Sequence, residues 1–77
     1  MMKELLEYIA QHLVDKPDKV SVTENMREGV VTLSLRVDTD DMGKVIGRQG
    51  RIVREIRTLL KAVGQRNGQK VMVEIVE

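Results

Sequence analysis

Two stretches of the chain repeat their apolar residues with the spacing of an amphipathic α-helix. The first stretch places one apolar face at Leu5, Leu6, Ile9, Ala10, Leu13 and Val14. Pro17 is expected to end this helix, because proline cannot continue one. The second stretch places its apolar face at Ile52, Ile56, Leu59, Leu60 and Val63, and Gly64 is expected to end that helix.

Three other stretches have the composition and alternation of β-strands. Residues 20–26 are rich in β-branched types, and residues 31–38 alternate strictly between apolar and polar side chains. A last strand is predicted around Val71, Val73 and Ile75. Turn-forming chemistry separates the first two strands, which are therefore expected to form an antiparallel hairpin; the residues are Asn25, Arg27, Glu28 and Gly29.

A short helix is predicted between the second strand and the long helix. Asp40 and Asp41 suit its start, because a carboxylate accepts hydrogen bonds from the N–H groups of a first helical turn. It should run through Val45 and stop at Gly47. The element order is then α-β-β-α-α-β, and a connection through two helices suits a right-handed crossover between parallel strands. We therefore expect an α+β fold, a three-stranded mixed sheet with three helices on one face.

Length and composition restrict the class of protein. The 77 residues predict a single domain over residues 1–77, and 42% hydrophobic with 32% charged residues is typical of a folded chain. Without cysteine, the chain has no disulfides, thiolate metal sites or cysteine nucleophile. Glu4 and Glu7 interrupt the N-terminal region where a signal peptide needs an apolar run, so we expect a cytoplasmic protein with no membrane association. So small a core favours oligomerisation.

The charges are distributed unevenly along the chain. Residues 43–70 carry eight basic residues against the single acid Glu55, a local charge of +7, whereas the remainder carries −6. This asymmetry predicts one electropositive face that could bind a polyanion. A solvated helix surface without a ligand would show the same pattern. Tyr8, the only aromatic residue, is expected to pack within its helix rather than to stack on bases, and we assign no role to His12.

A G-x-x-G turn connects the two helices of the basic segment. Gly47 and Gly50 allow positive φ angles and leave no side chain where a sugar-phosphate backbone must approach. Free N–H groups at the start of the following helix would face such an anion. Lys44, Arg48 and Arg51 add positive charge around the turn. The segment therefore predicts a phosphate-binding loop.

This loop and its apolar flanks resemble the signature of the KH domain, and the element order resembles the type II arrangement of that family. The segment is Ile46-Gly47-Arg48-Gln49-Gly50-Arg51-Ile52, and the resemblance extends over the whole chain. It implies a loop that clamps about four nucleotides of single-stranded RNA, or of single-stranded DNA. The residues that it implies in RNA binding are Lys44, Ile46, Gly47, Arg48, Gln49, Gly50, Arg51, Val53 and Arg54.

The resemblance also implies an apolar groove beside the loop for the bases. Its candidates are Ile46, Ile52, Val53 and Val37, of which Val53 lies one step off the apolar stripe and is the better groove candidate. For Ile52 and Val37, ordinary core packing is the competing interpretation. A basic stripe is predicted on the long helix, although a solvated face would look the same; it comprises Arg51, Arg54, Arg57 and Lys61.

As a member of this family, the chain would be a cytoplasmic RNA-binding protein, with the role of an RNA chaperone or post-transcriptional regulator. The resemblance further implies homodimers, pairing with a larger KH-containing protein, and a link to cell elongation and envelope homeostasis. The alternative is a protein-interaction module of the same fold without nucleic-acid binding.

An enzyme is a poor match to the sequence. Read as a calcium loop, the acidic segment starting at Asp38 has Met42 and Gln49 at positions that require ligands. No Gly-Lys-Ser/Thr follows the glycines, and His12 lacks a nucleophile. We therefore predict no catalytic residues, no metal and no cofactor.

Overall fold

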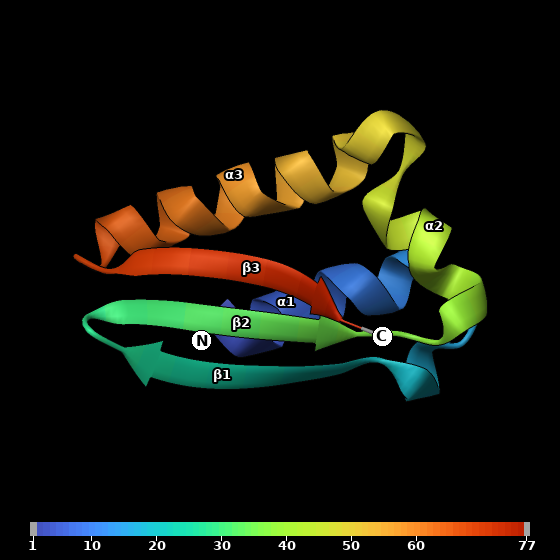
Figure 1. Ribbon diagram of the computed structural model, residues 1–77, viewed down its shortest axis with the longest axis horizontal. Coiled ribbons are helices and arrows are strands. Elements are labelled where there is room, and N and C mark those ends of the chain that lie inside the picture. Colours follow the sequence, from blue (N-terminus) through green and yellow to red (C-terminus); the bar gives the residue numbers. More distant parts are fainter. Residues whose placement is uncertain (1, 77) are drawn as a thin grey trace.

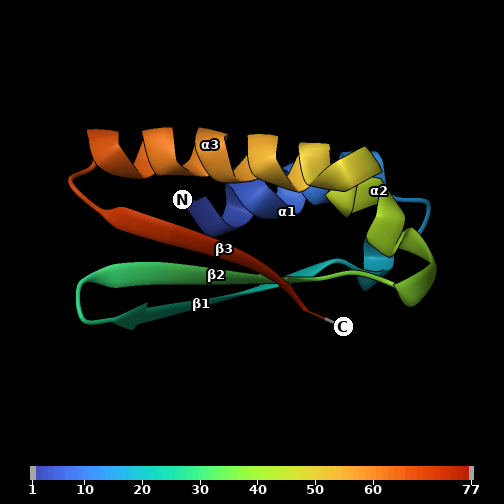
Figure 2. The same cartoon turned by 45° about the horizontal axis from the view of Figure 1, so that its top comes forward.

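The computed structural model describes residues 2–76 as a sheet covered on one face by helices (Figure 1). The order is α1 (Met2–Leu13), β1 (Ser21–Arg27), β2 (Val30–Arg36), α2 (Met42–Ile46), α3 (Arg51–Arg66) and β3 (Lys70–Val76). α1 and α3 lie over the sheet, and α2 packs against both of them at one end (Figure 2). Within the described residues, no helix combines the length and apolar character needed to span a membrane.

The three strands form a mixed sheet in the order β1-β2-β3. β1 pairs antiparallel with β2, with Val22 opposite Leu35. β3 pairs parallel with β2, with Leu33 opposite Val73. The predicted α+β architecture and element order are confirmed, and the crossover through α2 and α3 makes β3 an edge strand.

The β1–β2 turn is tighter than its sequence indicated. Only Glu28 and Gly29 form it, with φ angles of +54° and +78°. Two successive positive φ angles are the geometry of a type I′ hairpin, whose twist matches that of the strands. Asn25 and Arg27, which were expected in the turn, belong to β1.

The core lies between the sheet and the helices. Its most deeply buried side chains come from every layer: Leu6, Val31, Leu33, Leu35, Val45 and Leu60. Alternation along β2 therefore does separate a buried face from a partly exposed one. Tyr8 is 61% exposed, and its ring packs within α1 as expected, with its centroid 4.2 Å from that of the His12 ring.

Gly64 does not end α3, contrary to expectation. The helix continues to Arg66, and a positive φ of +71° at Gly68 occurs in the connection to β3. Gly64 is buried, and a Cβ added there would overlap Val71 Cγ2 and lie 3.0 Å from the Gln69 carbonyl oxygen. The glycine is thus needed for the close approach of α3 and β3, which the periodicity of one helix cannot indicate.

Gly64→Ala should destabilise the fold by about 1–2 kcal/mol. Overpacking against Val71 costs about 1–3 kcal/mol, and the better helix propensity of alanine offsets up to about 1 kcal/mol of that cost. Gly43→Ala in α2 is the matched control, since a Cβ at Gly43 meets nothing within 4 Å. That control should be neutral or stabilising by up to about 1 kcal/mol. Urea denaturation measures both variants, and equal stabilities would contradict the close approach at Gly64.

Candidate nucleic-acid interface

The loop between α2 and α3 has a backbone conformation that requires glycine at some positions and accepts side chains at others. Gly47 has φ 79° and ψ 174°, a region populated essentially by glycine. A Cβ at this position would lie 2.6 Å from Ile52 Cγ1 and 2.9 Å from the Ile52 backbone nitrogen. Gly50 is left-handed at φ 74°, and so is Gln49 at φ 57°. A strained non-glycine residue at an exposed loop tip is the kind of feature found at functional sites.

Internal hydrogen bonds hold this loop in shape. The Gly47 N–H donates to the Gly43 carbonyl at 2.9 Å, and the Gly50 N–H donates to the Gly47 carbonyl at 3.1 Å. The Arg51 N–H donates to the Arg48 carbonyl. The expectation of free N–H groups at the start of the second helix is therefore wrong for Gly50 and Arg51, because a 3-10 turn leads directly into α3. The side chains of Arg48 and Gln49 are exposed.

The acidic segment before α2 is organised differently from the predicted cap. The Asp38 carboxylate, not that of Asp40 or Asp41, accepts the capping hydrogen bond, from the Asp40 N–H at 2.9 Å. This hydrogen bond holds the pKa of Asp38 below its ordinary value. Asp41 is only 1% exposed and accepts hydrogen bonds from the backbone N–H groups of Asp15, at 3.3 Å, and Lys16, at 3.0 Å. Asp41 therefore ties the end of α1 to the start of α2.

Lys44 belongs to this acidic network. Its ammonium lies 3.3 Å from the Asp15 carboxylate and 3.5 Å from that of Asp41. The hydrogen bond from Lys44 to Asp15 raises the pKa of Lys44 above its ordinary value. Lys44, which is predicted to add positive charge around the loop, is thus paired with Asp15, just after α1, and with Asp41, three residues before it.

Asp41→Asn should cost about 1.5–3 kcal/mol of stability, because a buried charged acceptor of two backbone N–H groups becomes neutral and loses one acceptor oxygen. Asp40→Asn is the matched control, since the Asp40 side chain is 81% exposed and its Lys16 partner is a surface group. The control should change the unfolding free energy little. Chemical denaturation at neutral pH compares them, and equal losses would refute the role given to Asp41.

The basic stripe on α3 divides into cations with different partners. Arg51 pairs with Glu55 at 3.4 Å, Arg54 donates to the Gln49 carbonyl at 3.2 Å, and Arg57 donates to the Val73 carbonyl at 3.0 Å. Arg54 thus braces the loop, and Arg57 covers a carbonyl on the edge strand.

The apolar groove candidates also differ in burial. Val53 is 8% exposed and Val37 5%, whereas Ile46 and Ile52 are half-buried. Val53 is thus more covered than Ile52, the reverse of the expected order. The half-buried pair leaves apolar surface directly beside Gly47.

A groove runs between α3 and the edge strand β3. It consists of two adjoining cavities of about 220 and 350 Å³, which share Lys61, Val71 and Met72. Met72 is 60% exposed, and sequence reasoning assigned it no role. Alternation along β3 does place Met72 on the face of the strand opposite Val71 and Val73. The groove itself could not be predicted from that alternation, because it forms only where α3 packs beside β3.

Comparison with known families gives a match over nearly the whole chain. A family model described as KhpA/KhpB, KH domain matches residues 3–75. The chain belongs to this family. Similar proteins that are named RNA-binding protein KhpA agree with the assignment of this chain to the KhpA/KhpB family. That from Clostridium perfringens is 53% identical over 97% of this chain and 100% of the relative, and that from Aquifex aeolicus is 50% identical over 99% and 96%.

Solved structures support the fold of this KhpA/KhpB family member. Era from Aquifex aeolicus, bound to GDP and aluminium fluoride, superposes with a TM-score of 0.67 at 20% identity. A second structure, Era with MgGDPNP and nucleotides 1506–1542 of 16S ribosomal RNA, gives 0.62 at 21% identity. The match covers 96% of this chain in both cases, but only 29% and 28% of the Era chains. At this identity the likeness concerns the fold alone.

Proposed function

We propose that the protein binds single-stranded RNA, with the Gly47–Gly50 loop on the sugar-phosphate backbone and the bases in the groove beside it. The carrying observation is the loop itself: Gly47 holds a conformation closed to other residues, while Arg48 and Gln49 project into solvent. A backbone without a side chain at Gly47 permits close approach of a phosphate. Relatives about half identical in sequence are named RNA-binding proteins, which supports this proposal.

The cation next to the phosphate is Arg48 in this proposal. Lys44 is paired with acids and Arg51 with Glu55, whereas Arg48 forms no ion pair with any residue among 2–76. The positive end of the α3 dipole adds to the local field. Ile46, Ile52 and Val53 border the loop on its apolar side, and Gly50 and Arg54 maintain the shape of the loop. About four nucleotides would fit this mode of binding.

A protein-interaction module without nucleic-acid binding is the alternative. Such a module has no need for an exposed, cationic turn held in a glycine-specific conformation. The described residues contain no group of three metal-ligating side chains, and the absence of catalysis, metal and cofactor stays a prediction.

The partners and cellular role are proposals that rest on the family resemblance. We propose that residues 1–77 act as one KH unit in the cytoplasm, as an RNA chaperone or post-transcriptional regulator linked to cell elongation and envelope homeostasis. One groove without aromatic stacking gives weak affinity, so pairing with a second copy or with a larger KH protein of the KhpB kind would supply avidity. Sedimentation at several protein concentrations tests the homodimer.

The RNA proposal is tested by titrating the protein with short single-stranded RNA and DNA while following backbone amide chemical shifts. The largest shifts should fall on residues 46–54. Repeating the titration at several salt concentrations should give a log–log slope of about −2 to −3.5, because three to five phosphate contacts each contribute about −0.7. Absence of binding to either nucleic acid, or binding independent of salt, would contradict the proposal.

A further inference from the structure

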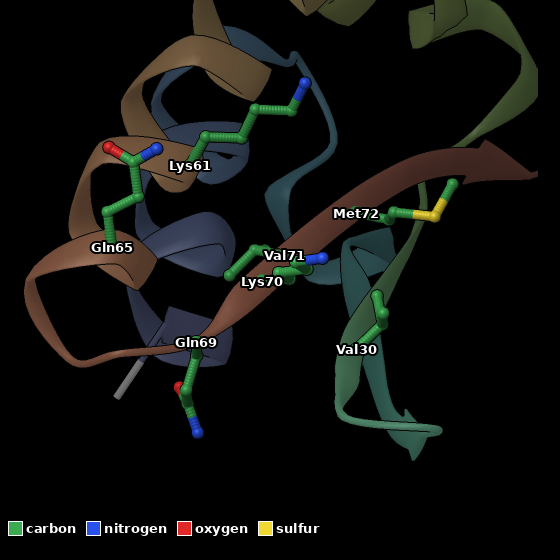
Figure 3. A pocket seen from close by; sticks show the side chains of 7 residues that line it. All are labelled: Val30, Lys61, Gln65, Gln69, Lys70, Val71 and Met72. Carbon is green, nitrogen blue, oxygen red and sulfur yellow. The ribbon is translucent and has the colours of Figure 1, made fainter.

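The end of the groove farthest from the G-x-x-G loop is a distinct pocket of about 350 Å³. Its apolar wall comes from Val30, Val71 and Met72. Figure 3 shows Lys61 and Gln65 extending from α3 on one side of it and Lys70 projecting from β3 on the other. From Gly50, the N-cap of α3, to Gln65 is about 22 Å along the helix axis, so this pocket is well separated from the loop.

The two lysines of this pocket differ from most other cations near the groove. Neither the Lys61 nor the Lys70 side chain forms an ion pair or hydrogen bond with another of the residues described by the structure. By contrast, Arg51 pairs with a carboxylate and Arg57 donates to a carbonyl. Glu74, which lines the adjoining cavity, accepts a hydrogen bond from the Ser34 hydroxyl at 2.7 Å. The pocket therefore combines an apolar wall with two uncompensated positive charges.

We propose that this pocket is a second nucleotide-binding point for the same RNA strand. An unstacked base would lie against Val71 and Met72, and Lys61 and Lys70 would neutralise the phosphate next to it. The Gln65 amide, which can both donate and accept hydrogen bonds, stands at the rim to contact the edge of the base. This inference rests on the proposed function and adds a second anchor at the end of the groove.

Charge and shape favour a nucleotide over a protein segment as the occupant. A base is flat and apolar on its faces, and its phosphate is an anion, which matches an apolar wall flanked by two free lysines. The volume is at the lower end of the range for small-ligand sites, which suits one nucleotide. Two anchors about 22 Å apart predict that affinity rises with RNA length until one strand reaches both.

The test compares Lys61→Gln/Lys70→Gln with a matched control, Lys3→Gln/Lys19→Gln, in which two lysines from outside the pocket are neutralised. Binding of RNA oligomers of four, six, eight and ten nucleotides is measured by fluorescence anisotropy at several salt concentrations. Wild type and control should bind more tightly as length increases. The pocket variant should lose most of that increase, at least about fivefold for the longest oligomer, and its salt slope should fall by about 0.7, the contribution of one phosphate contact.

The possible results separate the pocket from the loop. If wild type binds no RNA, the proposed function fails, and this inference fails with it. If wild type binds but the pocket variant and the control behave alike, the pocket is not an anchor. As a second measurement on the unaltered protein, the amides of residues 70–72 should shift with the longest oligomer. Unchanged shifts there, or a protein partner that competes only at this pocket while RNA affinity is unaffected, would overturn the inference.

Discussion

Replacing Arg48 and Gln49 together with aspartate is expected to abolish RNA binding and leave the fold intact. Both side chains are exposed, and Gln49 has a left-handed conformation that aspartate tolerates better than most residues. The hydrogen bond from Arg54 reaches the backbone carbonyl of residue 49, so the substitution retains it. Two carboxylates at the loop tip reverse the field that a phosphate meets, and affinity should fall by at least about a hundredfold.

The control for this variant is Arg48→Gln with Gln49→Asn, which removes the cation without adding anions. It should weaken binding by about tenfold or less and lower the salt slope by about 0.7. Circular dichroism and urea denaturation establish that both variants fold. If the double aspartate variant is folded and still binds RNA within about threefold of wild type, the loop is not the binding site.

Gly47→Ala should be the most damaging single substitution in the loop. The conformation at Gly47 costs any other residue about 1–3 kcal/mol, and the added Cβ overlaps Ile52, so the total is about 2–6 kcal/mol. A small domain has only about 4–12 kcal/mol in total, at about 0.05–0.15 kcal/mol per residue. We expect either a strongly destabilised protein or a rearranged loop, and in both cases loss of RNA binding.

Gly50→Asn is the matched substitution at the other glycine of the loop. Gly50 is left-handed, a conformation that asparagine accepts, and a Cβ there meets only Val53 Cγ1, at 3.9 Å. Its stability loss should be about 1 kcal/mol or less. Denaturation curves and RNA titrations of the two variants check the contrast, and an equally mild effect at Gly47 would refute the steric argument.

Acidification is not expected to change RNA binding at the loop as these substitutions do, but it weakens the hydrogen bond by which the Asp38 carboxylate caps the turn before α2. The pKa of Asp38 is lower in the folded protein than its ordinary value of 3.8, so its contribution to stability is present above that value. The contribution is lost as the pH falls from 3.8 through the lower folded pKa. Neutral and mildly acidic conditions therefore leave this cap in place.

Most of the elements and their order could be predicted because α1, α3, β2 and β3 each bury one face, which the local spacing of apolar residues indicates. Leu33 and Leu35 are buried two positions apart in a strand, whereas Leu6 and Ala10 in α1, and Ile56 and Leu60 in α3, are buried four positions apart. The G-x-x-G loop is equally local, since the freedom of Gly47 depends on its own missing side chain. Such properties follow from the sequence by itself.

The tertiary structure alone decided which of these residues are available to a ligand. Arg48 and Lys44 both lie close to the G-x-x-G loop in the sequence, yet the fold brings the Asp15 carboxylate to 3.3 Å from the ammonium of Lys44 and not to Arg48. The closing of the groove likewise depends on Gly64, which signals the end of a helix by local rules and instead allows α3 to approach β3. Charges and glycines can be located in the sequence. Coulomb and steric energies, however, depend on distances between residues that only the folded chain brings together.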